Sequence, residues 1–546
     1  MNDNKKIAYF SAEIGLSSDI PTYSGGLGVL AGDHIKASAD NGLNMVAITL
    51  LYKEGYFKQE IDDQGLQKEF YPSFDYDKHF ELIPKQVSIK LRGRNILINV
   101  YKYIYFGEKK HSIPIYFLDT NIAENHEDDQ KITLRLYSGD SDHRVLQESI
   151  LGIGGIRLLE ELGHTNIHKY HMNEGHCSFL TLELLRKYNN DEQLVKEKCH
   201  FTTHTPVPAG HDQFQISNCQ KILGDLLPSD LNLESLKNDN ILHMTELGLN
   251  FSSSANGVSE LHGNVAQKQF PNYNINFITN GVHHISWLGD DFKSLFDNKL
   301  SGWRQNPDLL SDLNTIEDTE LTNAHQLQKE KLLKEINSNI SNKFSSEILT
   351  IGFARRSAEY KRARLIFYDI DKLIDASNSQ IQIVFSGKAH PNDLGGKEII
   401  KDIYKTSKNL KNKISICFLE NYNMRLGKLI TSGVDVWLNT PLRPNEASGT
   451  SGMKAALNGI PNFSILDGWW AEACIDGSNG WSIGSPDYCN DKADSDSLYK
   501  RLKNEIIPLY YDNKKNWCQI MRSSINTSVD YTAHRMIQDY IKKYYK

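Results

Sequence analysis

The sequence lacks an apolar run long enough to cross a membrane, and its N-terminus, MNDNKKIAYFSAEIGL, has no apolar stretch of signal-peptide length. It also lacks a long block of one charge, because the net charge of −7 is spread over all 546 residues. This distribution argues against nucleic acid and anionic membranes as partners. We therefore expect a cytoplasmic protein.

Cysteine is scarce, and its pattern argues against crosslinks. The seven cysteines are odd in number, far apart and never arranged as CxxC, which favours reduced thiols over disulfides or a zinc site. The histidines nearest to a metal-binding pattern are His164, His168, His171 and His176, and they contain no HExxH motif. We expect no metal.

The length exceeds what a single hydrophobic core serves, so two or more domains are expected. Strands alternate with helices from Lys6–Ser11 onward, and a second alternating block runs from Ile348 to Leu466. The order strand, loop, helix is typical of parallel sheets that bind ligands at the carboxyl ends of their strands. The pattern predicts an α/β fold with two doubly wound, Rossmann-like domains facing each other across a cleft.

A polar, helix-rich region from Trp287 to about Asn342 separates the two blocks. We predict an N-terminal domain over residues 1–290 and a C-terminal domain over residues 291–530. Residues 531–546 have apolar positions on one helical face, so we expect a helix that docks onto a domain.

Lys454 follows the small residues Gly449–Gly452 and precedes an apolar helical run, which places it at a predicted helix start. Open backbone N–H groups and the helix dipole there suit a phosphate, and a partly buried amine nearby suits a Schiff base with pyridoxal phosphate. The alternative is a Gly/Ser-rich turn before an amphipathic helix with a solvated lysine. The motif alone leaves both interpretations open.

Five basic residues follow one predicted strand directly: Arg355, Arg356, Lys361, Arg362 and Arg364. Arginine forks and lysine charges at a strand end suit two phosphate groups held together, and the alternative is a solvated basic helix face.

Gly25-Gly26-Leu27-Gly28 lacks the spacing of a dinucleotide fingerprint. We interpret it first as a tight turn, with a phosphate-contacting backbone as the functional alternative.

Two histidines and two glutamates near strand ends are weaker candidates. His176 and His204 are each isolated, and a lone histidine is more often a packed, hydrogen-bonded residue than a catalyst. Glu174 and Glu446 form either a carboxylate pair for glycoside hydrolysis or hydrogen bonds to a sugar, and the sequence does not fix their separation.

Longer strings tie these residues together: SAEIGL at Ser11, GGLG at Gly25, HMNEGH at His171, FTTHTPVPAGH at Phe201, NGVSELHG at Asn256, TNGVHHISW at Thr279, ARRSAEYKR at Ala354 and EASGTSGMKAALNG at Glu446. On these strings the chain resembles the α-glucan phosphorylases, the family of glycogen, starch and maltodextrin phosphorylases, and especially their short bacterial and archaeal branch. The glycine loop alone is shared with starch and glycogen synthases.

The resemblance implies a GT-B fold with pyridoxal 5′-phosphate on Lys454. It implies that Arg355, Thr450 and Ser451 hold the cofactor phosphate. Arg356, Lys361 and the Gly26 N–H match the region that holds inorganic phosphate, and Gly25 and Gly26 of the glycine loop are also expected among the cofactor-binding residues. His204 matches the residue that bonds the 6-hydroxyl of the terminal glucose, and His176 and Glu174 match the cleft wall. The other positions that match contacts to this glucose are Asn280, Tyr360, Glu446, Ser448 and Gly449.

The implied activity is phosphorolysis of a glycogen or maltodextrin α-1,4-glucan. The cofactor phosphate acts as an acid toward the substrate phosphate, which protonates the departing glycosidic oxygen. The glucosyl cation then collapses onto that phosphate and gives α-D-glucose 1-phosphate with retained configuration. Lys454, Arg356, Lys361 and His204 are thus the expected catalytic residues.

Departures from the long, regulated phosphorylases limit what carries over. The SAE motif begins at Ser11, so we expect no phosphorylation or nucleotide control through an N-terminal arm, and the dimer built from that arm is not implied either. NEGH and TSGMK replace NDTH and TGNMK, which leaves the preferred glucan length open. The oligomeric state is open too, with a homo-oligomer as one option.

Two alternatives remain: a nucleotide-sugar glucosyltransferase of the glycogen or starch synthase type, and a catalytically silent glucan-binding homologue. A synthase needs no Schiff-base lysine, and a silent homologue would be expected to lose Arg356, Lys361 or Lys454.

Overall fold

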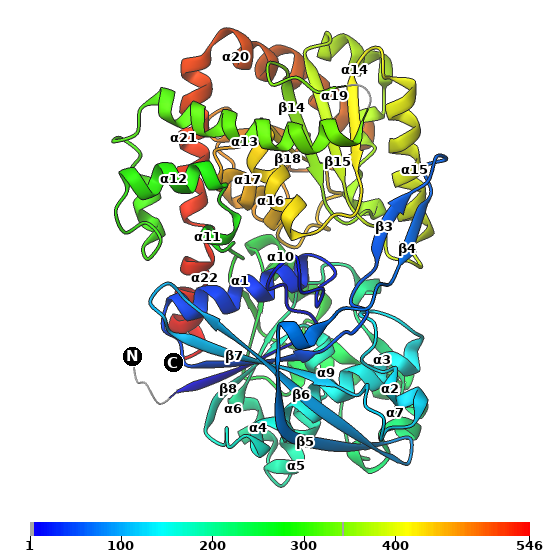
Figure 1. Ribbon diagram of the computed structural model, residues 1–546. Coiled ribbons are helices and arrows are strands. Elements are labelled where there is room, and N and C mark those ends of the chain that lie inside the picture. The colour runs from blue at the N-terminus through cyan, green and yellow to red at the C-terminus, as the bar shows by residue number, and fades with distance from the viewer. Residues whose placement is uncertain (1–4, 341–342) are drawn as a thin grey trace. The chain divides into compact units, whose positions relative to one another are not determined.

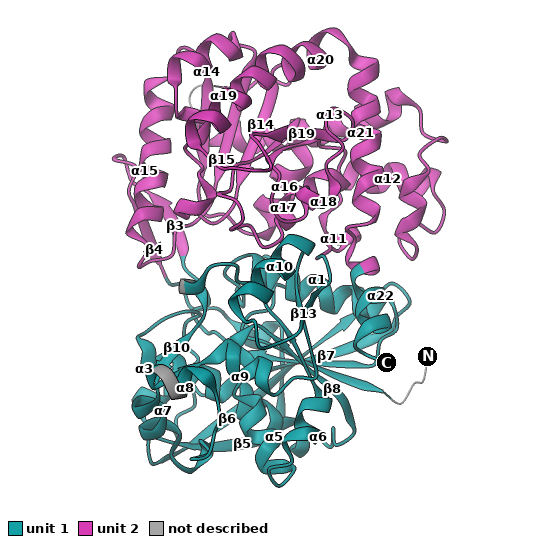
Figure 2. Cartoon of the chain, turned by 180° about the vertical axis from the view of Figure 1, so that it is seen from behind, with its two compact units in different colours: residues 1–57, 71–279, 536–546 teal, residues 58–70, 280–535 magenta. Residues whose placement is uncertain are grey.

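The computed structural model describes residues 5–340 and 343–546. Residues 1–4 of the predicted N-terminal domain and residues 341–342 of the predicted polar region lie outside this range. The chain divides into two compact units (Figure 2). The first unit consists of residues 1–57, 71–279 and 536–546, and the second unit of residues 58–70 and 280–535.

The first unit is built on a nine-stranded sheet (Figure 1). Seven neighbouring strands are parallel, and β6 and β5 extend the sheet as an antiparallel hairpin, as the sequence predicts for residues 86–105. In sheet order, the strands are β13 (Ile275–Phe277), β12 (Ser254–Gly257), β9 (Cys199–Thr202), β8 (Ile167–Asn173), β1 (Lys6–Ser11), β2 (Met45–Leu50), β7 (Ser112–Asp119), β6 (Arg94–Phe106) and β5 (Glu81–Leu91). A separate antiparallel pair is formed by β10 (Gln213–Gln215) and β11 (Ile241–His243).

The second unit is built on a six-stranded, fully parallel sheet. In sheet order, its strands are β16 (Ser415–Leu419), β15 (Ile381–Ser386), β14 (Leu349–Ala354), β17 (Val436–Asn439), β18 (Asn462–Ile465) and β19 (Gly480–Ile483). The central strands are buried along their whole length, as expected of parallel strands covered by helices on both faces.

Helices connect the strands of both sheets. Those of the first unit are α1 (Gly26–Asp40), α2 (Glu127–Gln130), α3 (Ser141–Ser149), α4 (Gly155–Glu161), α5 (Leu180–Lys187), α6 (Glu192–Lys198), α7 (Ile216–Leu223), α8 (Glu234–Asp239), α9 (Met244–Asn250), α10 (Glu260–Gln269) and, from residue 536, α22 (Ala533–Lys543). Those of the second unit are α11 (His284–Trp287), α12 (Asp290–Lys299), α13 (Asp318–Asn339), α14 (Ile370–Ser377), α15 (Leu394–Asn409), α16 (Met424–Gly433), α17 (Thr450–Leu457), α18 (Trp470–Ala473), α19 (Asp491–Arg501), α20 (Ile507–Asp512) and α21 (Lys514–Val529).

The predicted fold class is confirmed: the chain is α/β, with two units built on parallel sheets as in the GT-B fold. The predicted cleft stays a prediction. The sequence did not reveal β12 or β19, because their residues, SANG and GWSI, form no continuous apolar run.

The units are not contiguous in sequence, unlike the ranges 1–290 and 291–530 that we predict from the sequence. The hairpin of β3 (Lys58–Ile61) and β4 (Gln67–Phe70) belongs to the second unit. Its buried Gln59 donates to the Gly387 carbonyl at 2.8 Å. Gln67 donates to the Ala389 carbonyl at 2.9 Å and accepts from the Ala389 N–H at 2.9 Å. These main-chain bonds attach the hairpin to the loop after β15.

The C-terminal residues lie in the first unit, where α22 passes beside α1 (Figure 1). Tyr545 lies with its hydroxyl 3.1 Å from His34 Nε2 and 2.5 Å from His171 Nδ1. Tyr540 lies 3.2 Å from the Thr202 hydroxyl. Burial lowers the pKa of His34 to about 3, so this contact is made with a neutral ring. The Tyr545 hydroxyl, just beyond α22, thus bonds two buried histidines, one of α1 and one of β8.

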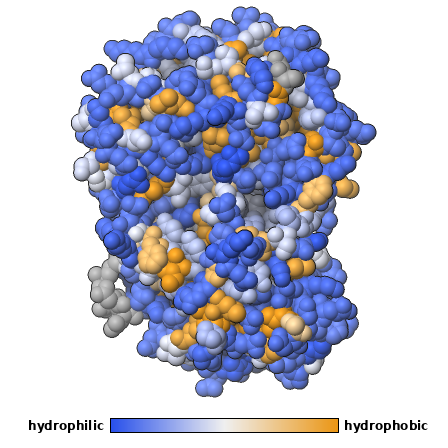
Figure 3. Space-filling view, viewed as in Figure 1, coloured by the Kyte–Doolittle hydropathy of each residue, from blue (hydrophilic) through white to orange (hydrophobic). Residues whose placement is uncertain are grey.

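Hydrophilic residues dominate the face shown in Figure 3, with hydrophobic residues in small scattered groups. No helix in residues 5–340 and 343–546 combines the length and apolar character needed to span a membrane.

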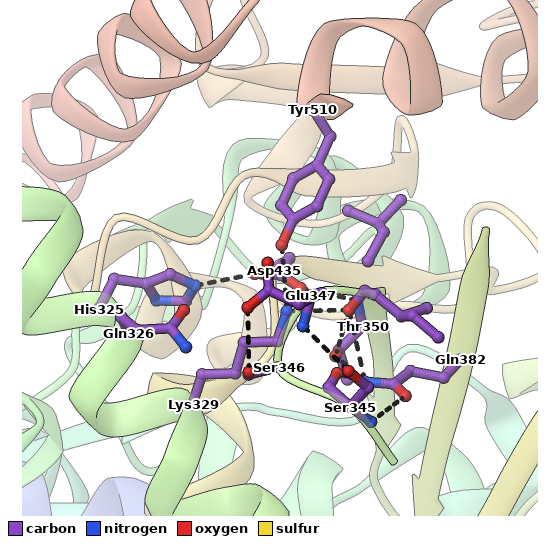
Figure 4. A network of polar contacts seen from close by, with 12 residues as sticks. His325, Gln326, Lys329, Ser345, Ser346, Glu347, Thr350, Gln382, Asp435 and Tyr510 are labelled. Carbon is purple, nitrogen blue, oxygen red and sulfur yellow. Dashed lines mark hydrogen bonds and ion pairs between the residues drawn. The ribbon is translucent and has the colours of Figure 1, made fainter. Parts of the chain in front are cut away.

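A buried polar network fixes α13 to the sheet of the second unit (Figure 4). Lys329 is fully buried and donates to Asp435 Oδ2 at 2.6 Å and to the Ile348 carbonyl at 2.8 Å. His325 Nε2 lies 2.9 Å from Asp435 Oδ1, and the Thr350 N–H donates to Asp435 at 2.7 Å. Burial raises the pKa of Asp435, but Lys329 and His325 outweigh it and lower that pKa. The carboxylate therefore stays ionised beside one buried ammonium.

We predict that Lys329→Met destabilises the second unit by about 3–5 kcal/mol, because it leaves a buried carboxylate without its cation. Lys331→Met is the matched control, since this lysine on the same helix is half exposed and pairs with Asp291 at 2.5 Å. Its loss should cost about 0–1 kcal/mol. Scanning calorimetry of both variants beside the wild type measures the difference. Equal melting shifts for the two variants would contradict the assignment.

Candidate active site

The glycine loop of the first unit is shaped by a close crossing of two main-chain segments. The Gly15 N–H donates to the Gly28 carbonyl at 2.7 Å. A Cβ added to Gly32 would lie 1.9 Å from the Gly15 carbonyl oxygen, and one added to Gly28 would lie 2.6 Å from Glu13 Oε2. Residues 13–15 therefore lie directly against the first turns of α1, where side chains have no room.

Gly25 and Gly26 differ from these packed glycines. Gly25 is the N-cap of α1, and no side chain of the described residues caps this helix end. A Cβ added to Gly25 or Gly26 would meet no heavy atom of the described part of the chain within 4 Å. The loop is thus both a tight turn and an open helix N-terminus, which suits an anion.

Glu174 organises the strand ends of the first unit that carry His204. Its carboxylate accepts from the His204 N–H at 2.7 Å and from the Thr205 hydroxyl at 2.9 Å. His204 Nε2 lies 2.7 Å from Asn173 Oδ1. Burial lowers the pKa of His204 to about 4, so the ring is neutral near pH 7. Glu174 also has a positive φ of 78°, a conformation that a non-glycine residue adopts only where its surroundings hold it.

His176 belongs to an adjacent charged cluster. Its Nε2 lies 3.1 Å from Asp212 Oδ2, which also accepts from Arg144 at 2.7 Å. Burial lowers the pKa of His176, but the bond to Asp212 outweighs it and raises that pKa. Arg144 Nη2 also lies 3.2 Å from Glu148 Oε1. Burial, with a further contribution from Asp212, raises the pKa of Glu148 to about 8. His176 is therefore positioned by Asp212 rather than isolated.

In the second unit, Glu446 is shared by two buried cations. Its Oε2 accepts from Arg355 Nη2 at 2.5 Å and from Lys361 Nζ at 2.6 Å. Burial raises the pKa of Glu446, but Arg355 and Lys361 outweigh it and lower the pKa to about 2. Arg355 also donates to Asn439 at the end of β17. Two cations therefore share the one Glu446 carboxylate.

The remaining basic residues of the segment divide into two groups. Arg356 is exposed, with Nη2 3.5 Å from the Tyr360 hydroxyl, and the Lys361 ammonium lies 4.4 Å from the Tyr360 ring centroid. Arg362 instead bonds the Thr440 and Pro441 carbonyls, and Arg364 pairs with Asp402 at 2.6 Å. The structure thus gathers Arg355, Arg356 and Lys361 around Tyr360 and Glu446, whereas Arg362 and Arg364 serve other contacts.

Helix α17 begins at Thr450, so Lys454 lies in its second turn rather than at the predicted helix start. The helix begins earlier because Gly449, with φ +87°, is its N-cap and TSGMK already has helical geometry. Lys454 is buried, and its ammonium lies 3.5 Å from the ring centroid of Trp287. Asn458 donates to the Trp287 carbonyl at 3.0 Å and so fixes α11 against α17. The solvated-lysine alternative is wrong.

Unsatisfied polar atoms gather at the first turn of α17. Ser448 Oγ, Ser451 Oγ and Arg355 Nε are buried and have no hydrogen-bond partner among the described residues. Buried polar groups normally have partners, so their presence beside an uncapped helix N-terminus fits a bound anion. A phosphate group with Lys454 nearby matches the chemistry of pyridoxal 5′-phosphate.

Asp467 braces the loop that carries Glu446. Its carboxylate accepts from the Glu446 N–H at 2.9 Å and from the Gly468 N–H at 2.9 Å, and the Trp469 N–H donates to the Ser448 carbonyl at 2.8 Å. Burial raises the pKa of Asp467 to about 7, with a further contribution from Glu446. The sequence reasoning missed Asp467, Asn439 and Trp287. Asp467 follows β18 and Asn439 is the last residue of β17, and that strand-end position is the signal that would have found them.

The site residues expected from the sequence fall on both units. Gly25, Gly26, Glu174, His176 and His204 lie on the first unit. The residues on the second unit are Asn280, Arg355, Arg356, Tyr360, Lys361, Glu446, Ser448, Gly449, Thr450, Ser451 and Lys454. Asn280 is buried, and its carbonyl accepts from Arg535 at 3.2 Å. A carboxylate pair of Glu174 and Glu446 stays a prediction, because the two residues belong to different units.

Metal-ligand groupings are absent from the described residues: no three His, Cys, Asp or Glu side chains there are arranged to hold a metal ion. The four histidines considered above have separate partners. His164 lies beside Lys6, His168 beside the Lys546 carbonyl, His171 beside Tyr545 and His176 beside Asp212.

Comparison with known proteins gives consistent matches. Residues 228–474 match the model of the carbohydrate phosphorylase family. The chain is 39% identical to the maltodextrin phosphorylase of Thermococcus litoralis, over 99% of this chain and 70% of the relative. It is 34% identical to the glycogen phosphorylase of Mycobacterium tuberculosis, over 99% of this chain and 70% of the relative. For the glycogen phosphorylase of Aquifex aeolicus, identity is 34% over 99% of this chain and 86% of the relative.

We predict that Asp467→Asn changes stability in a pH-dependent way. A pKa of about 7 in the folded protein, above the ordinary aspartate value, means that the folded state binds the proton more tightly than the unfolded state. Stability is therefore lost as pH rises from about 4 to about 7, and the amide variant escapes this loss. The free energy of unfolding of Asp467→Asn, taken relative to that of the wild type, should therefore increase by on the order of 2 kcal/mol as the pH rises from 5 to 8. Melting temperatures across this range measure the gain, with the exposed Asp487→Asn as control, and a pH-independent difference would refute the prediction.

Proposed function

This chain belongs to the carbohydrate phosphorylase family, and we propose that it acts with pyridoxal 5′-phosphate held through Lys454. It is an α-1,4-glucan phosphorylase, which transfers the non-reducing terminal glucose of a glucan to inorganic phosphate and releases α-D-glucose 1-phosphate. One observation carries the cofactor proposal: a buried lysine lies on the same short helix as an uncapped N-terminus surrounded by unsatisfied serine and arginine atoms.

The cofactor would be held by groups of α17, by Arg355 directly after β14 and by Trp287 of α11. The Lys454 amine would bond its aldehyde carbon, with the Trp287 ring against the amine. Its phosphate would take the unsatisfied Arg355 Nε and Ser451 Oγ and the backbone N–H groups of the first turn at Thr450 and Ser451. When bound, this cofactor supplies a phosphate group that exchanges a proton with the substrate phosphate.

On the second unit, inorganic phosphate would be bound by Arg356 and Lys361. On the first unit, the Gly26 N–H is the donor that the resemblance assigns to phosphate. Arg356 is exposed, and its Nη2 lies 3.5 Å from the Tyr360 hydroxyl, so its guanidinium can be reached by an anion from solvent. Lys361 is buried, and its ammonium lies 2.6 Å from Glu446 Oε2. Positive charge fixed before the reaction lowers the cost of bringing a second phosphate beside the first.

The terminal glucose would contact Asn280, Tyr360, Glu446, Ser448 and Gly449. Glu446 is ionised, so it can accept from sugar hydroxyls, and the unsatisfied Ser448 Oγ offers a further partner. On the first unit, His204 has a neutral ring that can bond a sugar 6-hydroxyl, and His176 and Glu174 are the further glucan-side residues of that unit. In the reaction, the bond from C1 to the glycosidic oxygen breaks, that oxygen takes a proton from phosphate, and a phosphate oxygen bonds C1.

The matched relatives are a maltodextrin phosphorylase and glycogen phosphorylases, and both names denote α-glucan substrates. We propose a glucan of this class without a fixed chain length. A reducing compartment such as the cytoplasm suits a chain whose seven cysteines are all free.

The two alternatives are less well supported. A nucleotide-sugar glucosyltransferase has no use for a buried lysine beside an anion-binding helix end. A silent homologue would have no need to bury two cations against one carboxylate, an arrangement that costs stability unless an anion completes it.

Purified protein with maltodextrin and inorganic phosphate tests the activity directly. Glucose 1-phosphate should form only when both substrates are present. Formation of glucan from a nucleotide sugar, without phosphorolysis, would favour the synthase-type alternative, and no reaction in either assay would favour the silent homologue.

We predict that Lys454→Ala loses the cofactor and activity, because no other amine takes its place at this position. Borohydride reduction followed by peptide mapping should find a pyridoxyl adduct on Lys454 in the wild type and none in the variant. Lys454→Arg is the matched control for charge, and it should be equally free of adduct. A reduced adduct on another lysine would refute the assignment.

We predict that Arg356→Ala keeps the cofactor but raises the KM for phosphate by about tenfold or more, since a charge-assisted contact is lost. Arg364→Ala is the matched control, because its side chain pairs with Asp402 on the surface. Kinetics at saturating maltodextrin measure both. A normal phosphate KM in Arg356→Ala would remove this residue from the phosphate site.

A further inference from the structure

Glu13, in the segment that follows β1, is a buried carboxylate bound to the glycine loop. Its Oε2 accepts from the Ser24 N–H at 2.5 Å and from the Gly25 N–H at 3.4 Å, and the Ser24 hydroxyl lies 3.1 Å away. Its Oε1 accepts from the Tyr137 hydroxyl at 2.9 Å. These four contacts come from neutral donors, although the side chain is only 2% exposed.

A buried carboxylate held by neutral donors is costly, because burial removes its hydration without supplying a cation in direct contact. Burial accordingly raises the pKa of Glu13, although the Ser24, Tyr137 and Gly25 bonds oppose the shift. A glutamine or an apolar residue would fill the same space at lower cost. The position therefore calls for a function of the carboxylate beyond packing.

Tyr137 is itself held in an unfavourable conformation. Its φ of 52° lies in the left-handed region, which a bulky residue adopts only when its surroundings hold it there. The Arg144 guanidinium lies 5.0 Å from the ring centroid, and the His176 ring lies 5.7 Å away on a tilted plane. Arg144 and His176 are fixed in turn by Asp212. This arrangement directs the Tyr137 hydroxyl at Glu13.

The loop that Glu13 binds carries the donors proposed for phosphate. The carboxylate takes the N–H groups of Ser24 and Gly25, so these two donors point toward Glu13. Gly26 follows as the first residue of α1, and the space beside both glycines is open. A loop of two consecutive glycines has many accessible conformations and needs external bonds to keep one.

We infer that Glu13 and Tyr137 are positioning residues: their hydrogen bonds fix Ser24 and Gly25 in the conformation that presents the Gly26 N–H to inorganic phosphate. The inference rests on the proposed function and deepens it. It says that the phosphate-binding loop is kept in one conformation by two residues that have no assigned contact with substrate or cofactor. It also explains why the protein keeps a buried carboxylate and a strained tyrosine in contact, although both are unfavourable for stability.

The kinetic test uses Glu13→Gln and Tyr137→Phe in the full-length, cofactor-loaded protein. Glu13→Gln keeps the shape but replaces one acceptor by a donor, so the phosphate KM should rise about tenfold. Tyr137→Phe removes one bond and should give a smaller rise in the same constant. The KM for maltodextrin and the cofactor content should stay within about twofold of the wild type. In the double variant, the phosphate KM should rise by less than the product of the two single increases, since both residues act on one hydrogen-bond network.

Tyr170→Phe is the control for the loss of a phenolic hydroxyl, because this tyrosine lies in the same unit, is more deeply buried than Tyr137 and has its hydroxyl beside Tyr188. It should leave the phosphate KM unchanged. A purely structural role of Glu13 would instead lower the melting temperature and leave the phosphate KM at the wild-type value, and this result would overturn the inference.

Amide hydrogen exchange gives a second readout that needs no activity. Exchange in peptides covering residues 22–30 should be faster in Glu13→Gln than in the wild type, and phosphate should slow it less in the variant. Unchanged exchange in this segment overturns the inference even where phosphorolysis is intact. A wild type without phosphorolysis would refute the proposed function, while the exchange experiment still decides whether Glu13 orders the loop.

Discussion

The arrangement of Arg355 and Lys361 on a single carboxylate, Glu446, is the constraint on which the second unit depends. Two cations share one ionised carboxylate there, and the neighbouring Asp467 carboxyl, with a pKa of about 7, is only partly ionised near neutral pH, so a bound anion would complete the charge of the site. The surroundings keep it in place: Asn439 accepts from Arg355, and Asp467 fixes the backbone of Glu446. The same loop leads into α17, so the geometry of the charges and that of the lysine are set together.

The network around Asp435 shows the contrasting use of buried charge in the same sheet. There one lysine meets one carboxylate, and the remaining oxygens are satisfied by His325 and the Thr350 N–H. The network has one lysine for its one carboxylate, and it fixes α13 to the sheet. Both carboxylates lie near the ends of parallel strands or their loops, and the number of lysine and arginine cations at each carboxylate is what separates the structural network from the functional one.

Much of the fold could be predicted because its strands are continuous apolar runs. The hairpin at residues 58–70 could not be assigned to the second unit, since its attachment through Gln59 and Gln67 to residues 387 and 389 involves contacts far apart in sequence. In the candidate site, the basic segment and Lys454 were recognisable by residue type, but the sequence could not separate Arg355 and Lys361 from Arg362 and Arg364. That separation depends on backbone direction, because Arg362 has φ +47° and turns away to bond two carbonyls.

The glycine loop shows why one motif supported two interpretations. Positions 28 and 32 require glycine because residues 13–15 lie against them and leave no room for a side chain. Gly25 and Gly26 face open space, so packing does not explain them, and an open helix N-terminus does. The turn and the anion site are thus neighbouring parts of one structure, and Glu13 connects them, since its carboxylate excludes a side chain at Gly28 while it accepts from Ser24 and Gly25. A string of four residues cannot reveal this division of roles, because it depends on what each glycine faces.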